Sequence, residues 1–343
     1  MSPKAFNHFG RKMLGLGAVA LSLTVAACGS SSTAGGTTTT PATVAPATCT
    51  VTTSDLSLGA GGTSAATAAS ISGSKTLKID GSTALAPLFQ SAQAAFDKAN
   101  GTTTTITPNG SGTGLKDVAS GAVDIGMSDV FASEKAVTGL TDNQVGVVIF
   151  SLVVSSDLQG KVTNLTSQQI KDIYAGNTTN WSQVGGPSEP ITVIVRTAGS
   201  GTRATFDRYV IGDPATKNDQ PVTALSADKT GDVVTAVTGH PGSIAYVGTS
   251  FVLNEAQKSA LNPICIDGNK PTQTDVNAGK YQFWSFEHAY TKTGGPAETA
   301  GSAAQAFLTY VKGTDFQSMD LPRLGFLTVT SIPAAVATTH QVK

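Results

Sequence analysis

The stretch VIVRTAGSGTRATF, residues 193–206, passes from a strand through a loop into a helix. The β-branched run Val193–Val195 is typical of a buried strand. The next residues, 197–202, are Thr, Ala, Gly and Ser, and helical spacing begins at Thr202. A Ser or Thr at such a place usually only caps the helix. With Arg196 just before the loop, the same arrangement also suits an anion, because a helix N-terminus offers unpaired N–H groups and partial positive charge.

The strand–loop–helix order recurs in KIDGSTALAP (78–87) and in TITPNGSGTGLKDV (105–118), and the strand VDIGM (123–127) runs into Ser128 and Asp129. In open α/β sheets, ligands bind outside the carboxyl ends of the strands. Glycine lets the backbone approach a ligand closely, and Ser and Thr add donor hydroxyls. Together these loops predict an anion site. A Walker loop, G-x-x-x-x-G-K-[ST], is absent from the sequence.

Strands and helices alternate along the chain, which predicts an α/β fold. The length of 343 residues predicts two domains. We expect residues 109–114 to form a loop. The expected strands are 76–80, 102–108, 122–127, 145–155 and 191–195. The expected helices are 85–101, 115–121, 166–176, 202–209 and 302–312.

The N-terminus has the pattern of an export signal. Basic residues precede an apolar run of fifteen residues, Met13–Ala27, which is too short to span a membrane comfortably. The sequence Val-Ala-Ala before Cys28 resembles a bacterial lipobox. We therefore expect a lipoprotein signal peptide at 1–27 and a lipid anchor on Cys28 that holds the protein on the outer face of the cell membrane or in the periplasm. The alternative is a plain signal peptide with an incidental cysteine.

Residues 28–74 are small, polar and almost uncharged, and we expect a flexible low-complexity linker there, with the folded body starting near Lys75. Export implies an oxidising compartment. Cys49 and Cys265 then form a candidate disulfide, which the sequence alone leaves open.

Composition and histidine content argue against several classes of protein. Charged residues make up 13% of the chain and the net charge is −1, so neither a nucleic-acid surface nor a polybasic membrane patch is expected. The four histidines are scattered, no Ser lies in a G-x-S-x-G elbow, and no His, Cys or Asp set has metal-ligand spacing. We therefore expect no catalytic residues, no metal and no cofactor, and a phosphatase is disfavoured. Trp181 and Trp284 are expected to serve packing or a surface anchor rather than the ligand.

Several motifs in order resemble the phosphate-binding proteins of bacterial high-affinity phosphate ABC transporters. The resemblance covers the body from Thr76 to the C-terminal helix region, and it is carried by Gly81-Ser82-Thr83 with Pro87, GSGTGLKD (110–117), VDIGMSD (123–129), IKDIYAGNTTNW (170–181), RTAGSGTRATF (196–206) and PGSIAYV (241–247).

The resemblance implies a type II periplasmic-binding-protein fold, in which two α/β domains close on the ligand. Domain I would comprise 75–152 and 248–343, and domain II would comprise 153–247. Two hinge crossings would fall near 150–155 and 246–250. The chain would capture inorganic phosphate as a monomer and deliver it to the permease subunits of an ABC transporter. The implied ligand-binding residues are Thr83, the backbone of Ala84, Ser111, Asp129, Arg196, Ser200, the Gly201 N–H and Thr202.

Asp129 is the unusual member of this set, because a carboxylate facing an anion is repelled unless a proton lies between them. Phosphate near neutral pH still carries a hydroxyl, which Asp129 can accept in a charge-assisted hydrogen bond. Sulfate has no such proton, so Asp129 would act as a selectivity filter. Two alternatives stay open: a binding protein for sulfate, molybdate or another oxyanion, and a phosphate-binding surface sensor or adhesin without a transporter.

One position departs from the family pattern. The second residue after the Arg is commonly acidic in the family and orients the guanidinium, but here it is Ala198. We therefore expect Arg196 to lack a nearby tether and the site to be more positive. Arg203 either adds positive potential or pairs with Asp207 four residues later.

Overall fold

The computed structural model describes residues 49–212, 224–254 and 259–341. By its internal contacts the chain divides into Met1–Val44 and Ala45–Lys343, and every described residue belongs to the second unit. The expected signal peptide at 1–27 and the expected lipidation site at Cys28 lie outside the described residues.

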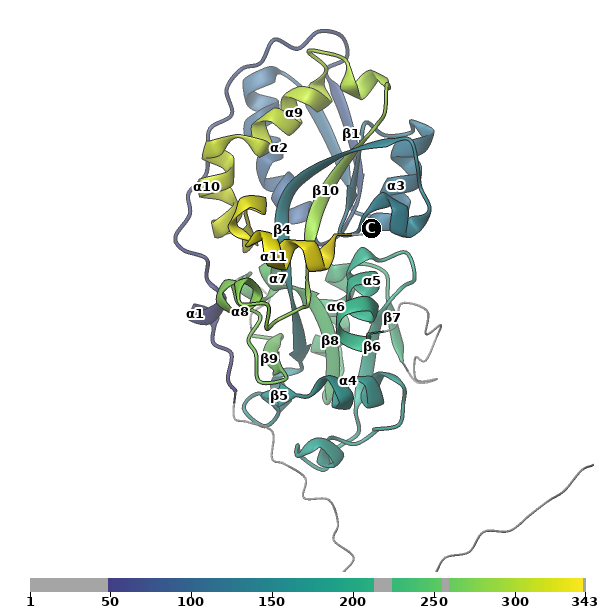
Figure 1. Ribbon diagram of the computed structural model, residues 1–343, viewed down its shortest axis with the longest axis vertical. Coiled ribbons are helices and arrows are strands. Elements are labelled where there is room, and N and C mark those ends of the chain that lie inside the picture. Colours follow the sequence, from purple (N-terminus) through teal and green to yellow (C-terminus); the bar gives the residue numbers. More distant parts are fainter. Residues whose placement is uncertain (1–48, 213–223, 255–258, 342–343) are drawn as a thin grey trace, which may run out of the picture. The chain divides into compact units, whose positions relative to one another are not determined.

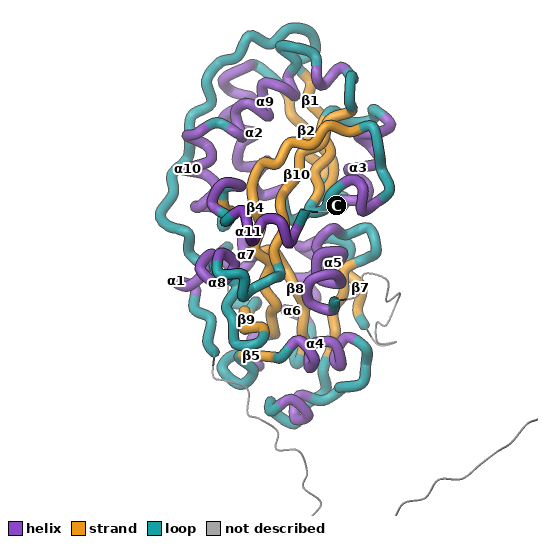
Figure 2. Tube along the Cα trace, viewed as in Figure 1, coloured by secondary structure: helices purple, strands orange, loops and turns teal. Residues whose placement is uncertain are grey.

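The strands of the described residues form one mixed sheet, ordered β2-β1-β3-β10-β4-β8-β6-β7, with β9 and β11 also paired to β4 and with β5 paired to β9 (Figures 1 and 2). Their bounds are β1 Thr76–Gly81, β2 Thr103–Thr107, β3 Ile125–Ser128, β4 Leu140–Val154, β5 Asn164–Leu165, β6 Thr192–Arg196, β7 Leu225–Ala227, β8 Ser243–Gly248, β9 Asn262–Ile266, β10 Trp284–Lys292 and β11 Phe326–Leu327.

Strand β4 joins two groups of strands. Its residues 140–149 pair antiparallel with β10, and its residues 150–154 pair antiparallel with β8. We call β1, β2, β3, β10 and β11 the first strand group, and β5 to β9 the second. The two segments expected to cross between domains lie side by side in this arrangement, because Phe150 pairs with Gly248 and Leu152 pairs with Tyr246.

Helices flank both strand groups, with α2, α9 and α10 on one side of the first group and α3 on the other (Figure 1). The helix bounds are α1 Thr53–Leu56, α2 Ala86–Asn100, α3 Ser111–Ser120, α4 Ser167–Tyr174, α5 Gly201–Phe206, α6 Thr230–Gly239, α7 Thr249–Leu253, α8 Gln273–Asn277, α9 Ala303–Lys312, α10 Thr314–Arg323 and α11 Ala334–Ala337. A wider π turn, Asp207–Ile211, continues α5.

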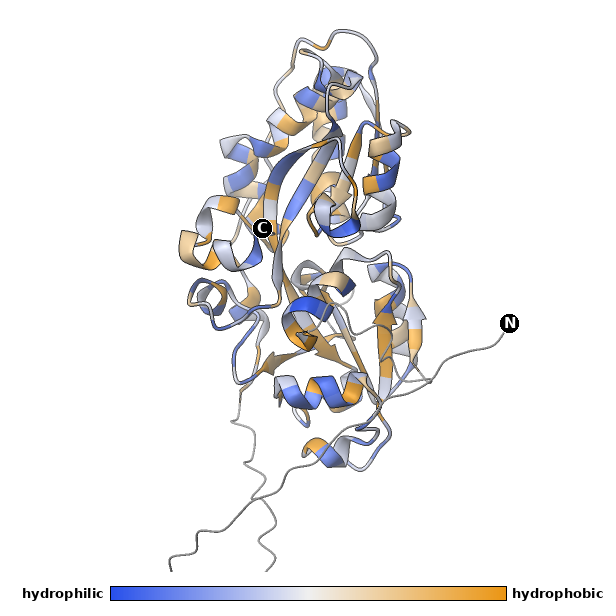
Figure 3. Cartoon of the chain, turned by 45° about the vertical axis from the view of Figure 1, so that its right-hand side comes forward, coloured by the Kyte–Doolittle hydropathy of each residue, from blue (hydrophilic) through white to orange (hydrophobic). Residues whose placement is uncertain are grey.

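Most of the expected helices are present with small shifts. Helix α2 buries Leu88, Phe89, Ala92 and Phe96, the residues whose spacing predicted it, and Gly101 ends it with a φ of 62°. The core is apolar along the strands, which Figure 3 shows by the hydrophobic colour on the second strand group. Trp181 and Trp284 are both fully buried, as residues that serve packing are.

Helix α3 corrects one expectation, because it begins at Ser111 rather than near residue 115. The residues expected to form a loop are therefore partly its first turn. Glycine lowers helix propensity and conceals this turn in the sequence. The glycine at 114 has a packing reason, since a Cβ there would lie 2.6 Å from the carbonyl oxygen of Asp80 on the adjacent strand.

The expectation of a flexible linker up to residue 74 is wrong for residues 49–74, which lie against the folded body. The candidate disulfide between Cys49 and Cys265, which the sequence left open, is present in the structure. The backbone N–H of Ser64 donates to Asp320 at 2.8 Å, and that of Ala69 donates to the side chain of Asn100 at 2.7 Å. Buried side-chain acceptors of the body thus bind the backbone of a segment that has few apolar residues of its own.

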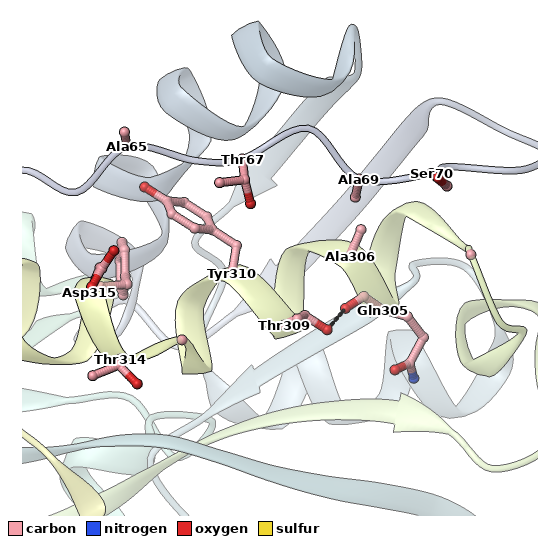
Figure 4. Close-up of a pocket in the computed structure, with 13 residues that line it drawn as sticks. Ala65, Thr67, Ala69, Ser70, Gln305, Ala306, Thr309, Tyr310, Thr314 and Asp315 are labelled. Carbon is pink, nitrogen blue, oxygen red and sulfur yellow. Dashed lines mark hydrogen bonds between the residues drawn. The ribbon is translucent and has the colours of Figure 1, made fainter.

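A cavity of about 500 Å³ lies between this N-terminal segment and α9 (Figure 4). Its lining includes Ala65, Thr67 and Tyr310, and the Tyr310 hydroxyl donates to the carbonyl of Ser64 at 3.2 Å. None of the predicted ligand-binding residues lines it. The cavity is therefore a feature of how the segment packs, separate from the loops that the sequence singled out.

Candidate anion-binding site

Three strand-end loops meet around Asp129. Strands β1 and β3 run parallel with Gly81 opposite Met127, so their ends bring Ser82 and Asp129 together. The N–H of Ser82 donates to the Met127 carbonyl at 2.9 Å, which fixes this loop. Thr202 reaches the same point from the first turn of α5, which follows β6 of the second strand group.

Asp129 is 2% exposed and is hydrogen-bonded from both strand groups. The Ser82 hydroxyl donates to Oδ1, and the Thr202 hydroxyl donates to Oδ2 at 2.8 Å. The backbone N–H of Asp129 donates to Ser111 Oγ at 3.1 Å, at the start of α3. One carboxylate thus links loops that are far apart in the sequence.

Burial raises the pKa of Asp129 above its ordinary value. The hydrogen bonds from Ser82 and Thr202, and then the positive charge of Arg196, act in the opposite direction. Two opposing effects therefore act on Asp129. Burial favours its protonated form, whereas the neighbouring donors and the charge of Arg196 favour its ionised form.

Arg196 is 1% exposed, and neutral groups hold its guanidinium. Nε donates to the Ala227 carbonyl at 3.2 Å, and Nη2 donates to the Asp228 carbonyl at 2.9 Å. Nη1 donates to Thr230 Oγ1 at 3.2 Å, and Nη2 also donates to Thr83 Oγ1 at 3.1 Å. Thr83 lies in the loop after β1, so Arg196 contacts both strand groups.

No carboxylate among the described residues forms a salt bridge with Arg196. Burial lowers the pKa of Arg196, while the charge of Asp129 raises it. A buried guanidinium bonded only to neutral acceptors keeps much of its positive charge uncompensated, which is costly without an anion nearby. This arrangement suits an anionic ligand.

The loop before α5 caps that helix and also packs against the start of α3. Ser200 Oγ accepts the N–H of Arg203 at 3.2 Å, so Ser200 is indeed a helix cap. Its neighbour Gly201 packs directly against Ser111 and Asp129, where a Cβ would lie 2.9 Å from the Cβ of Asp129. The carbonyl of Gly199 accepts the N–H of Gly112 at 3.0 Å. This loop and the start of α3 are thus in direct contact.

The structure brings the predicted ligand-binding residues to one place, and all of them are buried. Direct hydrogen bonds join Thr83 to Arg196, and join Asp129 to Ser111 and to Thr202. Ala84 enters through its backbone N–H, which donates to Ser82 Oγ at 3.1 Å. Their role in binding a ligand stays a prediction.

Sequence reasoning missed two residues of this cluster, Ser82 and Thr230. Ser82 lies in the motif Gly81-Ser82-Thr83, from which the resemblance implies only Thr83 as a ligand-binding residue. Thr230 begins α6, and its hydroxyl is 2.9 Å from that of Thr83. The sequence gives only a weak signal for Thr230, because the strand–loop–helix order recurs there after β7, a strand of three residues.

Ala198 does not leave Arg196 without support. Ala198 is exposed, and the carbonyls of Ala227 and Asp228 orient the guanidinium instead. No described carboxylate replaces the missing acidic residue as a salt-bridge partner of Arg196, as expected, but neutral carbonyl groups orient the guanidinium in its place. Arg203 pairs with Asp207 at 3.3 Å, as one of the two readings of the sequence expected.

Charged side chains surround the loops. Arg208 pairs with Glu134 at 2.8 Å, which links the turn after α5 to the 3-10 turn Ala132–Lys135. Lys135 Nζ donates to the Ala198 carbonyl at 3.4 Å, and burial lowers the pKa of this lysine. The contact between the strand groups thus includes an ion pair as well as the buried hydrogen bonds.

Within the described ranges, no cluster of three His, Cys, Asp or Glu side chains could hold a metal ion. Of the helices in these ranges, none has the length and apolar character needed to cross a membrane. His288 pairs with Asp142 at 2.9 Å, and His340 is buried between the rings of Tyr209 and Trp284.

Comparison with known proteins adds independent information. A family model described as the PBP superfamily domain matches residues 60–313. Phosphate-binding protein PstS of Bacillus subtilis is 35% identical over 263 residues, which cover 76% of this chain and 82% of that protein. Alkaline phosphatase L of Pseudomonas aeruginosa is 30% identical over 154 residues, which cover 39% of this chain and 40% of that protein.

Solved structures match the same fold. A phosphate ABC transporter substrate-binding protein from Clostridium perfringens, solved with bound phosphate, superposes with a TM-score of 0.65 at 26% identity and covers 74% of this chain and 99% of its own. An ABC-type phosphate transport receptor from Vibrio cholerae superposes with a TM-score of 0.58 at 24% identity. The match covers 74% of this chain and 99% of that one, and at this identity it supports the fold only.

Proposed function

Because this chain belongs to the PBP superfamily, and within it to the family of the PstS phosphate-binding proteins, we propose that it captures inorganic phosphate outside the cytoplasm and delivers it to an ABC transporter. The ligand contacts would come from Thr83, Ala84, Ser111, Asp129, Arg196, Ser200, Gly201 and Thr202, with Ser82 and Thr230 supporting them.

The observation that carries this proposal is the presence of Arg196 and Asp129 in one buried cluster without a salt bridge between them among the described residues. Among the residues that the structure describes, Arg196 is a buried cation whose hydrogen bonds all go to neutral groups, so it attracts an anion. Asp129 would repel that anion unless the ligand brings a proton. Phosphate is an oxyanion that still carries a proton near neutral pH, and Asp129 can accept it. Sulfate has no proton to donate, so it would bring an ionised oxygen against the Asp129 carboxylate, and this repulsion would cost several kcal/mol.

The proposed division into domains 75–152 plus 248–343 and 153–247 follows the two strand groups except at β9, Asn262–Ile266, which pairs with β5 of the second group. Hydrogen bonds between the two strand groups join Thr83 to Arg196 and Asp129 to Thr202. A ligand that contacts both groups would favour the closed arrangement over an open one. Delivery would follow when the closed form docks on permease subunits of the transporter.

Export and lipid anchoring are part of the proposal. The signal pattern at 1–27 and Cys28 supports them, and the Cys49–Cys265 disulfide suits an oxidising compartment outside the cytoplasm. We propose that the chain acts as a monomer, which light scattering of the purified protein tests.

Binding without turnover is the proposed activity. The partial likeness to alkaline phosphatase L spans less than half of either chain, so it is a reason to test for hydrolysis. Arg196 and the hydroxyls around it suit anion binding, and no His or Cys is hydrogen-bonded to these hydroxyls in the described part of the chain. Release of phosphate from a monoester at a rate that falls with loss of Arg196 would add a second activity.

Titration calorimetry of the purified protein with phosphate, sulfate and molybdate tests the proposal. We expect phosphate to bind far more tightly than the other two, and Arg196→Met to weaken it by about 100-fold. Lys98→Met, which removes one positive charge from an exposed position on α2, is the control and should leave affinity unchanged. Equal affinity for sulfate would assign the protein to another oxyanion. Phosphate uptake by cells that lack the chain then separates a transport protein from a surface sensor or adhesin.

A further inference from the structure

Glu287 is a fully buried carboxyl group directly beside the candidate site. It lies on β10 and is 0% exposed. Strand β10 pairs antiparallel with β3 through His288 and Ser128, so the next position in register sets Glu287 opposite Asp129. The carboxyl that is expected to face the ligand thus has a second carboxyl behind it, in the middle of the sheet.

Within the described ranges, both carboxyl oxygens of Glu287 lack a hydrogen-bond partner. The polar side chain that acts on it is the carboxyl of Asp129. Two ionised carboxylates only accept hydrogen bonds, so this pair can bond only if one of the two carries a proton. An ionised, buried and unpaired Glu287 is strongly disfavoured.

The two carboxyls differ in their environments. Asp129 receives hydroxyl donors from Ser82 and Thr202 and feels the charge of Arg196, and all three favour its ionised form. Burial, and then the negative charge of Asp129, raise the pKa of Glu287 well above its usual value. The neighbouring His288 projects to the other face of the strand, where Asp142 pairs with it. The shared proton therefore belongs on Glu287 and the charge on Asp129.

We propose that Glu287 is a protonated positioning residue, which donates a hydrogen bond to Asp129 and holds that carboxylate ionised as the acceptor for the proton of the ligand. The inference rests on the proposed phosphate function and adds a residue to it. It also explains how two acidic groups coexist in an anion site, because the pair carries one negative charge instead of two.

Two substitutions separate this role from simple packing. Glu287→Gln keeps a donor of the same shape, so phosphate affinity should stay within about threefold of the unmodified protein, with selectivity over sulfate retained. Glu287→Leu removes the donor, and affinity should fall by about tenfold or more. Infrared spectra of the ligand-free protein should show a C=O stretch of a protonated carboxylic acid that disappears in Glu287→Gln.

Asp80→Asn is the matched control. It removes another buried carboxyl, on β1, which accepts a hydrogen bond from Asn109 at 2.9 Å, and it should leave the Glu287 band in place. A tenfold gain in phosphate affinity on Glu287→Gln would overturn the proposal, because it would mean that an ionised glutamate had been repelling the ligand. An unchanged infrared spectrum in that variant would overturn it as well.

The infrared measurement keeps the proposal testable if Glu287→Leu fails to fold. It also distinguishes failure of the proposed phosphate function from failure of the proposed protonation of Glu287. Failure of the unmodified protein to bind phosphate would overturn the proposed function, whereas the presence or absence of the carboxylic acid band still decides which form Glu287 takes.

Discussion

The guanidinium of Arg196 donates to the hydroxyl of Thr83 at 3.1 Å, although the two residues are 113 positions apart in the sequence. The same hydroxyl lies 2.9 Å from that of Thr230. Thr83 follows a strand of the first group, and Arg196 ends a strand of the second. This contact therefore ties the two groups together at the place where the charged residue of the site is held.

Thr83→Val should weaken phosphate binding by about tenfold to 100-fold, because it removes a hydroxyl that bonds a charged group in a buried setting. Thr83→Ser keeps the hydroxyl and should stay within about threefold of the unmodified protein. Calorimetry measures both. Thr105→Val, on the exposed side of β2, is the control, and equal losses for the Val and Ser variants at position 83 would contradict the assignment.

Asp129→Asn should change selectivity more than stability. The amide can donate to an oxyanion that has no proton, so sulfate affinity should rise by about tenfold or more while phosphate affinity falls by a similar factor. The ratio of the two dissociation constants is the measurement. Asp172→Asn, on the partly exposed α4, removes the same charge elsewhere and should leave the ratio unchanged. A ratio that stays constant in Asp129→Asn would remove Asp129 from the selectivity mechanism.

His340 should make folding stability sensitive to acid. Its ring is stacked at 3.8 Å on both Tyr209 and Trp284, and burial lowers its pKa from 6.5 to about 4. The folded state therefore favours the neutral ring, whose stabilising contribution is present above pH 6.5 and is lost as the pH falls from 6.5 towards 4. The loss should reach about 2–3 kcal/mol.

Denaturant unfolding of His340→Phe across this pH range checks the effect. Phenylalanine keeps the stacking and does not titrate, so the variant should lose less stability than the unmodified protein between pH 6.5 and 4. His240→Gln, at an exposed position, is the control. Identical pH dependence for His340→Phe and the unmodified protein would show that His340 does not contribute in this way.

The double variant Cys49→Ser, Cys265→Ser should lose about 2–4 kcal/mol of stability and keep its phosphate affinity. The disulfide joins the N-terminal segment to β9, and no ligand-binding residue lies next to it in the sequence. Thermal unfolding and limited proteolysis of residues 49–74 measure the loosening. A large fall in phosphate affinity would instead couple this segment to the site.

Much of the fold could be predicted from the sequence because local signals agreed with it. The apolar spacing in α2, the β-branched run at the start of VIVRTAGSGTRATF and the repeated strand–loop–helix order each mark an element that the structure contains. The order of residues 49–74 could not be predicted from their polar, low-complexity composition. It depends on hydrogen-bond acceptors such as Asp320, which lie far away in the sequence.

The candidate site was predictable where a motif carried it and hidden where only tertiary contacts define it. Asp129 and Arg196 stand in quoted motifs. Thr230 follows the short strand β7, whose three residues give a weak signal. Glu287 lies in a strand with no motif, and its position opposite Asp129 depends on an antiparallel pairing between segments about 160 residues apart. Ala198 correctly indicated that Arg196 has no acidic partner beside it, but the carbonyl groups that orient the guanidinium could not be predicted, because they depend on tertiary contacts.

The most direct test of the account is a crystal structure of the protein grown with phosphate. We expect one phosphate between the two strand groups, with its oxygens within hydrogen-bond distance of the Arg196 guanidinium and the Thr83 and Thr202 hydroxyls, and one of them beside the carboxylate of Asp129. A phosphate bound elsewhere, with Arg196 and Asp129 both free of it, would contradict the central claim.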